Sequence, residues 1–137
     1  KSKPAADSRE FKIFNELEVE ISDFDTMDRI LSAVGFQAVQ RYEKCRETMT
    51  LGQIIFCLDT MPYGTFLEIE GREADIRQYA ARLNLNWNER IILNYLEIFE
   101  ILKKKRQLEF DDPTFENFQT NNLNLAALVD QLHAGDA

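Results

Sequence analysis

Charged side chains alternate with apolar ones along several short segments of this 137-residue chain. Carboxylate oxygens are the ligands that Mg²⁺ and Mn²⁺ prefer, and ammonium and guanidinium groups bind phosphate. The segments "NELEVEIS", "YEKCRE", "IIFCLD" and "FLEIEG" carry both kinds of group. The candidate residues are Glu16, Glu18 and Glu20 in the first segment, Lys44 and Arg46 in the second, Asp59 in the third, and Glu68 and Glu70 in the last.

Strand geometry would place the charges of each segment on one side, because successive side chains of a strand point to opposite faces. Two carboxylates on alternate residues lie about 7 Å apart, and they repel by roughly 0.6 kcal/mol in water and about 2.4 kcal/mol at an effective dielectric of 20. A sheet with one solvated face tolerates this repulsion and is the simpler explanation of the spacing. The alternative is a confined site, where Lys44, Arg46 and a divalent metal would balance the carboxylates.

The elements that must position these residues follow from hydrophobic periodicity and turn chemistry. Residues 11–21, 36–49, 51–59 and 65–70 are predicted to be strands, with the aliphatic side of the first packed under a helix. Helices are predicted from Ser22 to Gly35, around Ile76–Leu83, and from 87 to 106, where Tyr95 belongs to the apolar stripe. A short helix is expected to start at Pro113, and a weaker one covers 123–132. Strands holding one helix and followed by further helices predict an α+β fold.

Length and composition narrow the class of protein. The length suits one domain, the 45% hydrophobic content is that of a globular protein, and no apolar run reaches the roughly 20 residues of a membrane helix. The formal charge of −8 argues against a general nucleic-acid binder. Cys45 and Cys57 lack close-spaced ligand partners, which disfavours a zinc site. We expect reduced thiols in a cytoplasmic protein, and a single disulfide is the alternative.

The order of these pieces resembles the CYTH superfamily of triphosphate tunnel metalloenzymes. "ELEVEISD", a helix ending in "VGF", "RYEKCRETM", "IIFCLDTMPYGTFLEIEG" and "NYLEIF" are similar to the C-terminal half of class IV adenylate cyclase-like proteins. The resemblance implies an antiparallel β-barrel, or tunnel, lined by charged residues. Residues 1–106 would be the C-terminal part of that domain, about half of the barrel, and 107–137 a C-terminal extension with short helices.

The resemblance also implies roles for individual residues. Divalent Mg²⁺ or Mn²⁺ would be bound by Glu16, Glu18, Asp59, Glu68 and Glu70. Phosphate groups would be bound by Lys44 and Arg46, with Lys1, or Lys3 as its rival, as a match to the family's lysine before a Gly-Pro loop. Phe14 stands where the family has an arginine, so Lys12 is a candidate replacement. No residue is assigned as a covalent nucleophile.

The activity implied is metal-dependent processing of ATP or another triphosphate. A cyclase would make cyclic AMP and pyrophosphate, and a thiamine or inorganic triphosphatase would release orthophosphate. The E-x-E-x-K strand that begins the family's domain is not found in this sequence, so we expect the chain to be incomplete as an enzyme and capable of homodimer formation. The alternatives are a non-catalytic polyphosphate- or nucleotide-binding domain, and an interaction domain with a solvated sheet face. Neither nucleic acid nor membrane is expected as a partner.

Overall fold

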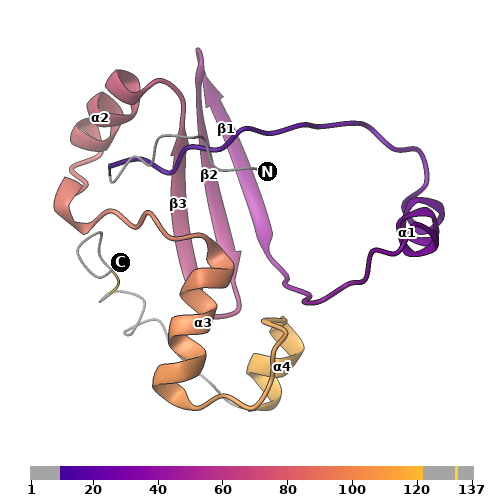
Figure 1. Cartoon of the computed structure of the whole chain (residues 1–137). Coiled ribbons are helices and arrows are strands. Elements are labelled where there is room, and N and C mark those ends of the chain that lie inside the picture. Colours follow the sequence, from indigo (N-terminus) through magenta and orange to yellow (C-terminus); the bar gives the residue numbers. More distant parts are fainter. Residues whose placement is uncertain (1–9, 122–131, 133–137) are drawn as a thin grey trace.

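The computed structural model describes residues 10–121 and residue 132. In these residues, α1 (Phe24–Ala33) precedes a sheet made of β1 (Cys45–Leu51), β2 (Ile54–Met61) and β3 (Gly64–Glu70). The chain continues through α2 (Glu73–Arg82), a 3₁₀ turn η1 (Trp87–Glu89), α3 (Tyr95–Arg106) and α4 (Phe115–Thr120) (Figure 1). This arrangement confirms the α+β class. The described strands form an open sheet, and the barrel stays a prediction.

The sheet is an antiparallel meander in the order β1-β2-β3. Gly52 makes the first turn with a φ of 63°, a conformation that costs glycine little because it has no Cβ. Pro62 and Tyr63 connect β2 to β3. The register places Arg46 opposite Asp59 and Cys57 opposite Glu68. Two-residue turns therefore fix which charged residues face one another.

The strand predicted over residues 11–21 is wrong, because this segment forms only an isolated bridge at Asn15 and adds no strand to the sheet. The strand predicted over 36–49 is shortened in the same way and starts only at Cys45. Residues 13–39, here called the arm, loop out beside β1 and carry α1 away from the sheet (Figure 1). The aliphatic residues Leu17 and Val19 are exposed instead of packed under a helix. Alternation alone does not make a strand, because pairing requires a neighbouring strand.

Both ends of the arm are fastened to later parts of the chain. Before the arm, the Phe11 ring packs on Trp87 with 5.4 Å between centroids, and Arg90 Nε donates to the carbonyl oxygen of Glu10 at 3.0 Å. After it, the backbone N–H of Arg41 donates to Asp112 Oδ1 at 2.8 Å. These contacts fix where the arm leaves the folded part and where it returns.

The helix predicted over 87–106 is also corrected, since the chain forms only one 3₁₀ turn at 87–89 and α3 begins at Tyr95. Asn94 and Glu97 form a capping box, in which Glu97 N–H donates to Asn94 Oδ1 at 2.9 Å and Asn94 N–H donates to Glu97 Oε2 at 2.7 Å. Such a box satisfies two backbone donors that the helix leaves unpaired. Four basic residues, 103–106, end α3 as predicted, where they complement its dipole.

The hydrophobic core lies where α3 and α4 meet the β2–β3 turn. Its buried members are Met61, Tyr63, Ile98, Phe99, Leu102, Phe118 and Leu132. The Tyr63 hydroxyl donates to the carbonyl oxygen of Tyr95 at 2.9 Å, which satisfies a buried polar group and ties the turn to the start of α3. The core therefore holds the first turn of α3 in a fixed position relative to the sheet.

The C-terminal part of the chain is described only in part. The short helix expected after Pro113 is present as α4, capped by the Thr114 side chain. The weaker helix expected over 123–132 lies outside the described residues, except for Leu132, and the expected boundary at 106 stays a prediction. Across the described residues, every helix is too short or too polar to cross a lipid bilayer.

Candidate functional site

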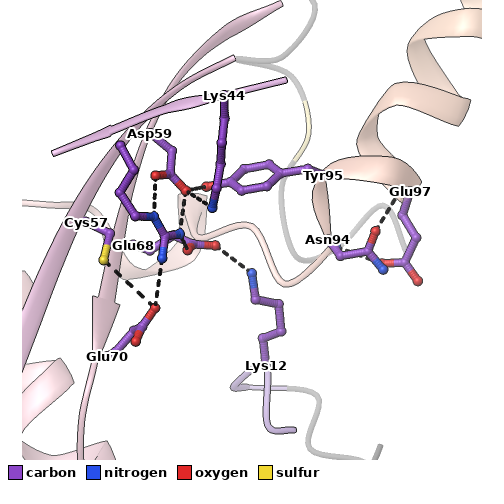
Figure 2. A network of polar contacts seen from close by, with 10 residues as sticks. Lys12, Lys44, Cys57, Asp59, Glu68, Glu70, Asn94, Tyr95 and Glu97 are labelled. Atoms are coloured by element: carbon purple, nitrogen blue, oxygen red, sulfur yellow. Dashed lines mark hydrogen bonds and ion pairs between the residues drawn. The ribbon is translucent and has the colours of Figure 1, made fainter. Parts of the chain in front are cut away.

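One face of the sheet brings together most of the charged residues singled out in the sequence. Arg46 on β1, Asp59 on β2 and Glu68 on β3 share this face because of the register, and Lys44 reaches it from the residue before β1. Lys12 reaches it from the segment that enters the arm. Figure 2 shows Lys12, Lys44, Asp59 and Glu68 converging with Tyr95 from the start of α3. The predicted convergence is therefore observed for Lys44, Arg46, Asp59 and Glu68, but not for Glu18, which lies outside the sheet.

Asp59 is at the centre of this cluster, and it is 0% exposed. Arg46 forms a bidentate pair with it, Nε donating to Oδ1 and Nη2 to Oδ2, both at 2.6 Å. Lys44 Nζ donates to Oδ2 at 3.1 Å, and the Tyr95 hydroxyl donates to the same oxygen at 2.8 Å. A buried carboxylate is stable only with such partners. Asp59 thus orients two cations and a phenol at once.

The electrostatics of Asp59 and Tyr95 follow from these contacts. Burial by itself raises the pKa of the Asp59 carboxyl, but hydrogen bonds from Arg46, Tyr95 and Lys44 outweigh it and hold the pKa well below its usual range. Burial raises the pKa of Tyr95, and its hydrogen bond to the Asp59 carboxylate raises it further. Asp59 is therefore ionised and Tyr95 neutral at physiological pH.

Glu68 extends the cluster toward solvent. It accepts from Lys12 Nζ at 2.8 Å through Oε1 and from Arg46 Nη2 at 2.6 Å through Oε2. Burial raises its pKa, but the hydrogen bond and positive charge of Lys12, together with the charge of Arg46, give a net lowering. Glu70 lies farther out, with its Oε1 3.9 Å from Arg46 Nη1. The outer carboxylates are therefore less enclosed than Asp59.

Tyr95 is the site residue that the sequence prediction missed, since it was assigned to the apolar stripe of a longer helix. Its ring lies under two ammonium groups, with Lys44 Nζ 5.4 Å and Lys12 Nζ 5.7 Å from the ring centre. Cation–π attraction of this kind helps to hold both lysines. The capping-box spacing of Asn94 and Glu97 was the available signal, because it places Tyr95 at the first position of α3.

The other predicted site residues lie elsewhere. Glu16 and Glu18 are exposed on the arm and belong to no strand of the sheet. Lys1 lies outside the described residues. Within residues 10–121, no three carboxylate, thiol or imidazole groups are close enough together to hold a metal ion. Cys45 and Cys57 are free thiols, the first exposed and the second buried.

No curated protein and no solved structure matches the chain. A family model described as the CYTH domain matches residues 2–112, which include the whole sheet and every described member of the charged cluster. The match covers well over half of the sequence, and the chain therefore belongs to the CYTH family.

Proposed function

We propose that the charged sheet face binds the phosphate groups of a triphosphate compound through Lys12, Lys44 and Arg46. The observation that carries this proposal is the convergence of these three cations around Asp59 and Tyr95. Each ammonium has three N–H donors, so the ion pair that each lysine makes with a carboxylate leaves donors for a ligand. Membership of a family whose proteins bind triphosphate substrates supports the same reading.

The charge balance of the cluster indicates whether the triphosphate binds alone or together with a metal ion. The three positive charges of Lys12, Lys44 and Arg46 are matched by three negative charges on Asp59, Glu68 and Glu70. The cluster is therefore close to neutral before any ligand arrives. A triphosphate brings several more negative charges, which need compensation in a partly desolvated place. We infer that the ligand binds together with divalent metal.

The donor set of the site fits this inference. CYTH proteins generally use divalent metal ions, and Mg²⁺ is usually held by one or two carboxylates together with substrate phosphate oxygens. Glu68 and Glu70 are the two carboxylates that would complete such a shell. Asp59 is already bonded by Arg46, Lys44 and Tyr95, so we assign it to positioning those groups. When bound, the metal supplies charge neutralisation at the phosphoryl oxygens.

We further propose that the bound triphosphate undergoes phosphoryl or nucleotidyl transfer. In an adenylate cyclase the 3′-hydroxyl of ATP attacks the α-phosphorus and pyrophosphate leaves, and in a triphosphatase water attacks the terminal phosphorus. In either reaction, Lys12 and Lys44 would hold phosphate oxygens while Arg46, fixed by Asp59, keeps its place in the cluster. No covalent nucleophile is invoked.

A non-catalytic polyphosphate- or nucleotide-binding domain is the second candidate, and one observation favours it. The two carboxyls of the cluster with a resolved pKa shift, Asp59 and Glu68, are both shifted downward by their partners. A general base works best with a pKa close to the operating pH. The described carboxylates are therefore better suited to holding cations than to moving protons.

Thermal unfolding with ligands tests the binding proposal. Tripolyphosphate with Mn²⁺ should raise the melting temperature by mass action, and the same concentrations of tripolyphosphate alone or Mn²⁺ alone should raise it less. Lys44→Met should remove most of the shift, whereas Lys104→Met on the exposed surface of α3 is the matched control. Absence of a shift with the pair of ligands would contradict the proposal.

Turnover separates the two candidate functions. The purified chain is incubated with ATP or tripolyphosphate plus Mn²⁺, and cyclic AMP and orthophosphate are measured. Cyclic AMP indicates the cyclase and orthophosphate the triphosphatase. Binding without either product supports the non-catalytic domain.

A further inference from the structure

The arm exposes an apolar stripe that no described part of the chain covers. Leu17 is fully exposed and Val19 is 83% exposed, and Ile21 continues the same alternation. Glu18 and Glu20 lie between these aliphatic residues in the sequence, so the two kinds of side chain alternate. Exposing such a stripe to water is unfavourable, since the burial of apolar surface is the main driving force of association.

The sheet exposes a matching surface at β1. This strand is an edge of the sheet, and all seven of its residues are exposed. The sheet face opposite the charged cluster carries Met49 and Leu51 together with Glu47 on β1, with Leu58 on β2 and Leu67 on β3, all exposed. An exposed edge presents unpaired backbone donors and acceptors that can accept another strand.

We propose that residues 17–21 of one copy of this chain add as a strand to the β1 edge of a second copy. Alternation makes the two partners complementary on both faces. When Leu17, Val19 and Ile21 lie on the apolar face with Met49 and Leu51, the glutamates between them necessarily lie on the face of Lys44 and Arg46. The aliphatic side chains then lie on the face of Met49 and Leu51, where Glu47 is the one carboxylate of β1, and the glutamates lie on the face of the cations.

This complementarity indicates that the partner of the β1 edge is the arm of a second copy of the chain. Each chain offers one arm and one β1 edge, so the exchange is reciprocal and closes as a two-fold dimer. The arm is fastened at Phe11 and at Arg41, and between these points it extends away from the sheet (Figure 1). It is thus presented outward, where the edge of another molecule can reach it.

The exchange has a consequence for the charged cluster. Glu18 and Glu20 of the partner's arm would lie beside Arg46, on the side of β1 that faces away from Asp59. The sequence predicts that the acidic segment of Glu18 and the acidic segment of Glu68 share one site. In the dimer they would be supplied by two different chains. The dimer itself depends only on the arm and the edge, so it is tested without any triphosphate.

Cysteine scanning tests the pairing through the native thiol of Cys45. This thiol is exposed at the start of β1, and its strand parity puts it on the apolar face, whereas Cys57 is buried. Single cysteines are introduced at 17, 18, 19, 20 and 21 in a Cys57→Ala background, and the variants are oxidised mildly. We expect a disulfide-linked dimer on non-reducing gels from at least one odd position, and none from the even positions.

A second measurement follows the oligomeric state by light scattering after gel filtration across a dilution series. Wild type should be dimeric at high concentration, Val19→Asp should be monomeric, and Val39→Asp should remain dimeric. Val39 is a matched control because it is also on the arm and 92% exposed, but outside the proposed strand. Circular dichroism checks that the variants stay folded.

Three results would contradict the proposed pairing of the arm with the β1 edge of a second copy. A wild-type monomer at all concentrations excludes the dimer. A disulfide formed within one chain shows that the arm pairs with its own β1 edge. Equal crosslinking from odd and even positions shows contact without strand register.

Discussion

Replacement of Asp59 by asparagine tests whether the charged cluster is organised around this carboxylate. The substitution keeps the size of the side chain and removes its charge. Arg46 and Lys44 then lose their central counterion, and the amide nitrogen of asparagine cannot accept the bonds that Oδ1 and Oδ2 accept now. The folded state should be destabilised at neutral pH.

The burial of Asp59 sets the size of the destabilisation that Asp59→Asn should cause. Removing one partner of a fully buried ion pair costs about 3–5 kcal/mol, because a charge is left buried without compensation. Asp59 is 0% exposed, but the side chains of Arg46 and Lys44 are 32% and 26% exposed and regain part of their hydration. Arg46 also keeps Glu68 as a partner. We therefore expect a loss of about 2–3 kcal/mol, or on the order of 10 °C in melting temperature.

The pH dependence supplies an independent check. The pKa of Asp59 is lower in the folded chain than the roughly 3.9 of an unfolded aspartate, so its contribution to stability is complete above that value and disappears as the pH falls. The difference in unfolding free energy between wild type and Asp59→Asn should therefore be largest near pH 7. It should shrink steadily below about pH 4.

Urea unfolding at pH 7 and at steps toward pH 3 measures this difference. Asp75→Asn is the control, because the ion pair that Asp75 makes among the described residues is with the exposed Arg72 at (i, i+3), and its loss should cost no more than about 0.5 kcal/mol. Equal stability of wild type and Asp59→Asn, or a gap that does not change with pH, would refute the account. Weaker Mn²⁺ binding by a folded Asp59→Asn variant would return Asp59 to the metal ligands.

Other predictions concern ligand binding and the core. Glu68→Gln should weaken Mn²⁺ binding in the presence of tripolyphosphate more than Glu73→Gln at the exposed start of α2, as measured by calorimetry; equal losses would count against a metal role for Glu68. Lys44→Met should raise the dissociation constant for tripolyphosphate with Mn²⁺ by roughly tenfold, the effect of losing one charge-assisted hydrogen bond of about 1.5 kcal/mol, and Lys104→Met should leave it unchanged. Tyr63→Phe should lower the unfolding free energy by about 1–2 kcal/mol, because the carbonyl oxygen of Tyr95 loses its donor; no change would show that water replaces it.

Strand parity made much of the candidate site predictable from the sequence. Arg46, Asp59 and Glu68 were expected on one face, and the observed register places them there. The reason is local, since two-residue turns and a period of two leave little freedom in an antiparallel meander. The basic end of α3 and the helix after Pro113 were predictable for the same reason, because they depend on neighbouring residues alone.

Tertiary structure decided what local pattern could not. Residues 11–21 alternate as clearly as any strand, yet in the described chain they form one bridge at Asn15 and no strand, because pairing needs a partner edge in the right place. Tyr95 enters the cluster only because the core around Phe99 and the Tyr63 hydrogen bond hold the start of α3 against the sheet. The sequence by itself determined which residues share a face. Packing between distant segments determined which of those residues meet, since contacts across such separations depend on the fold and not on spacing.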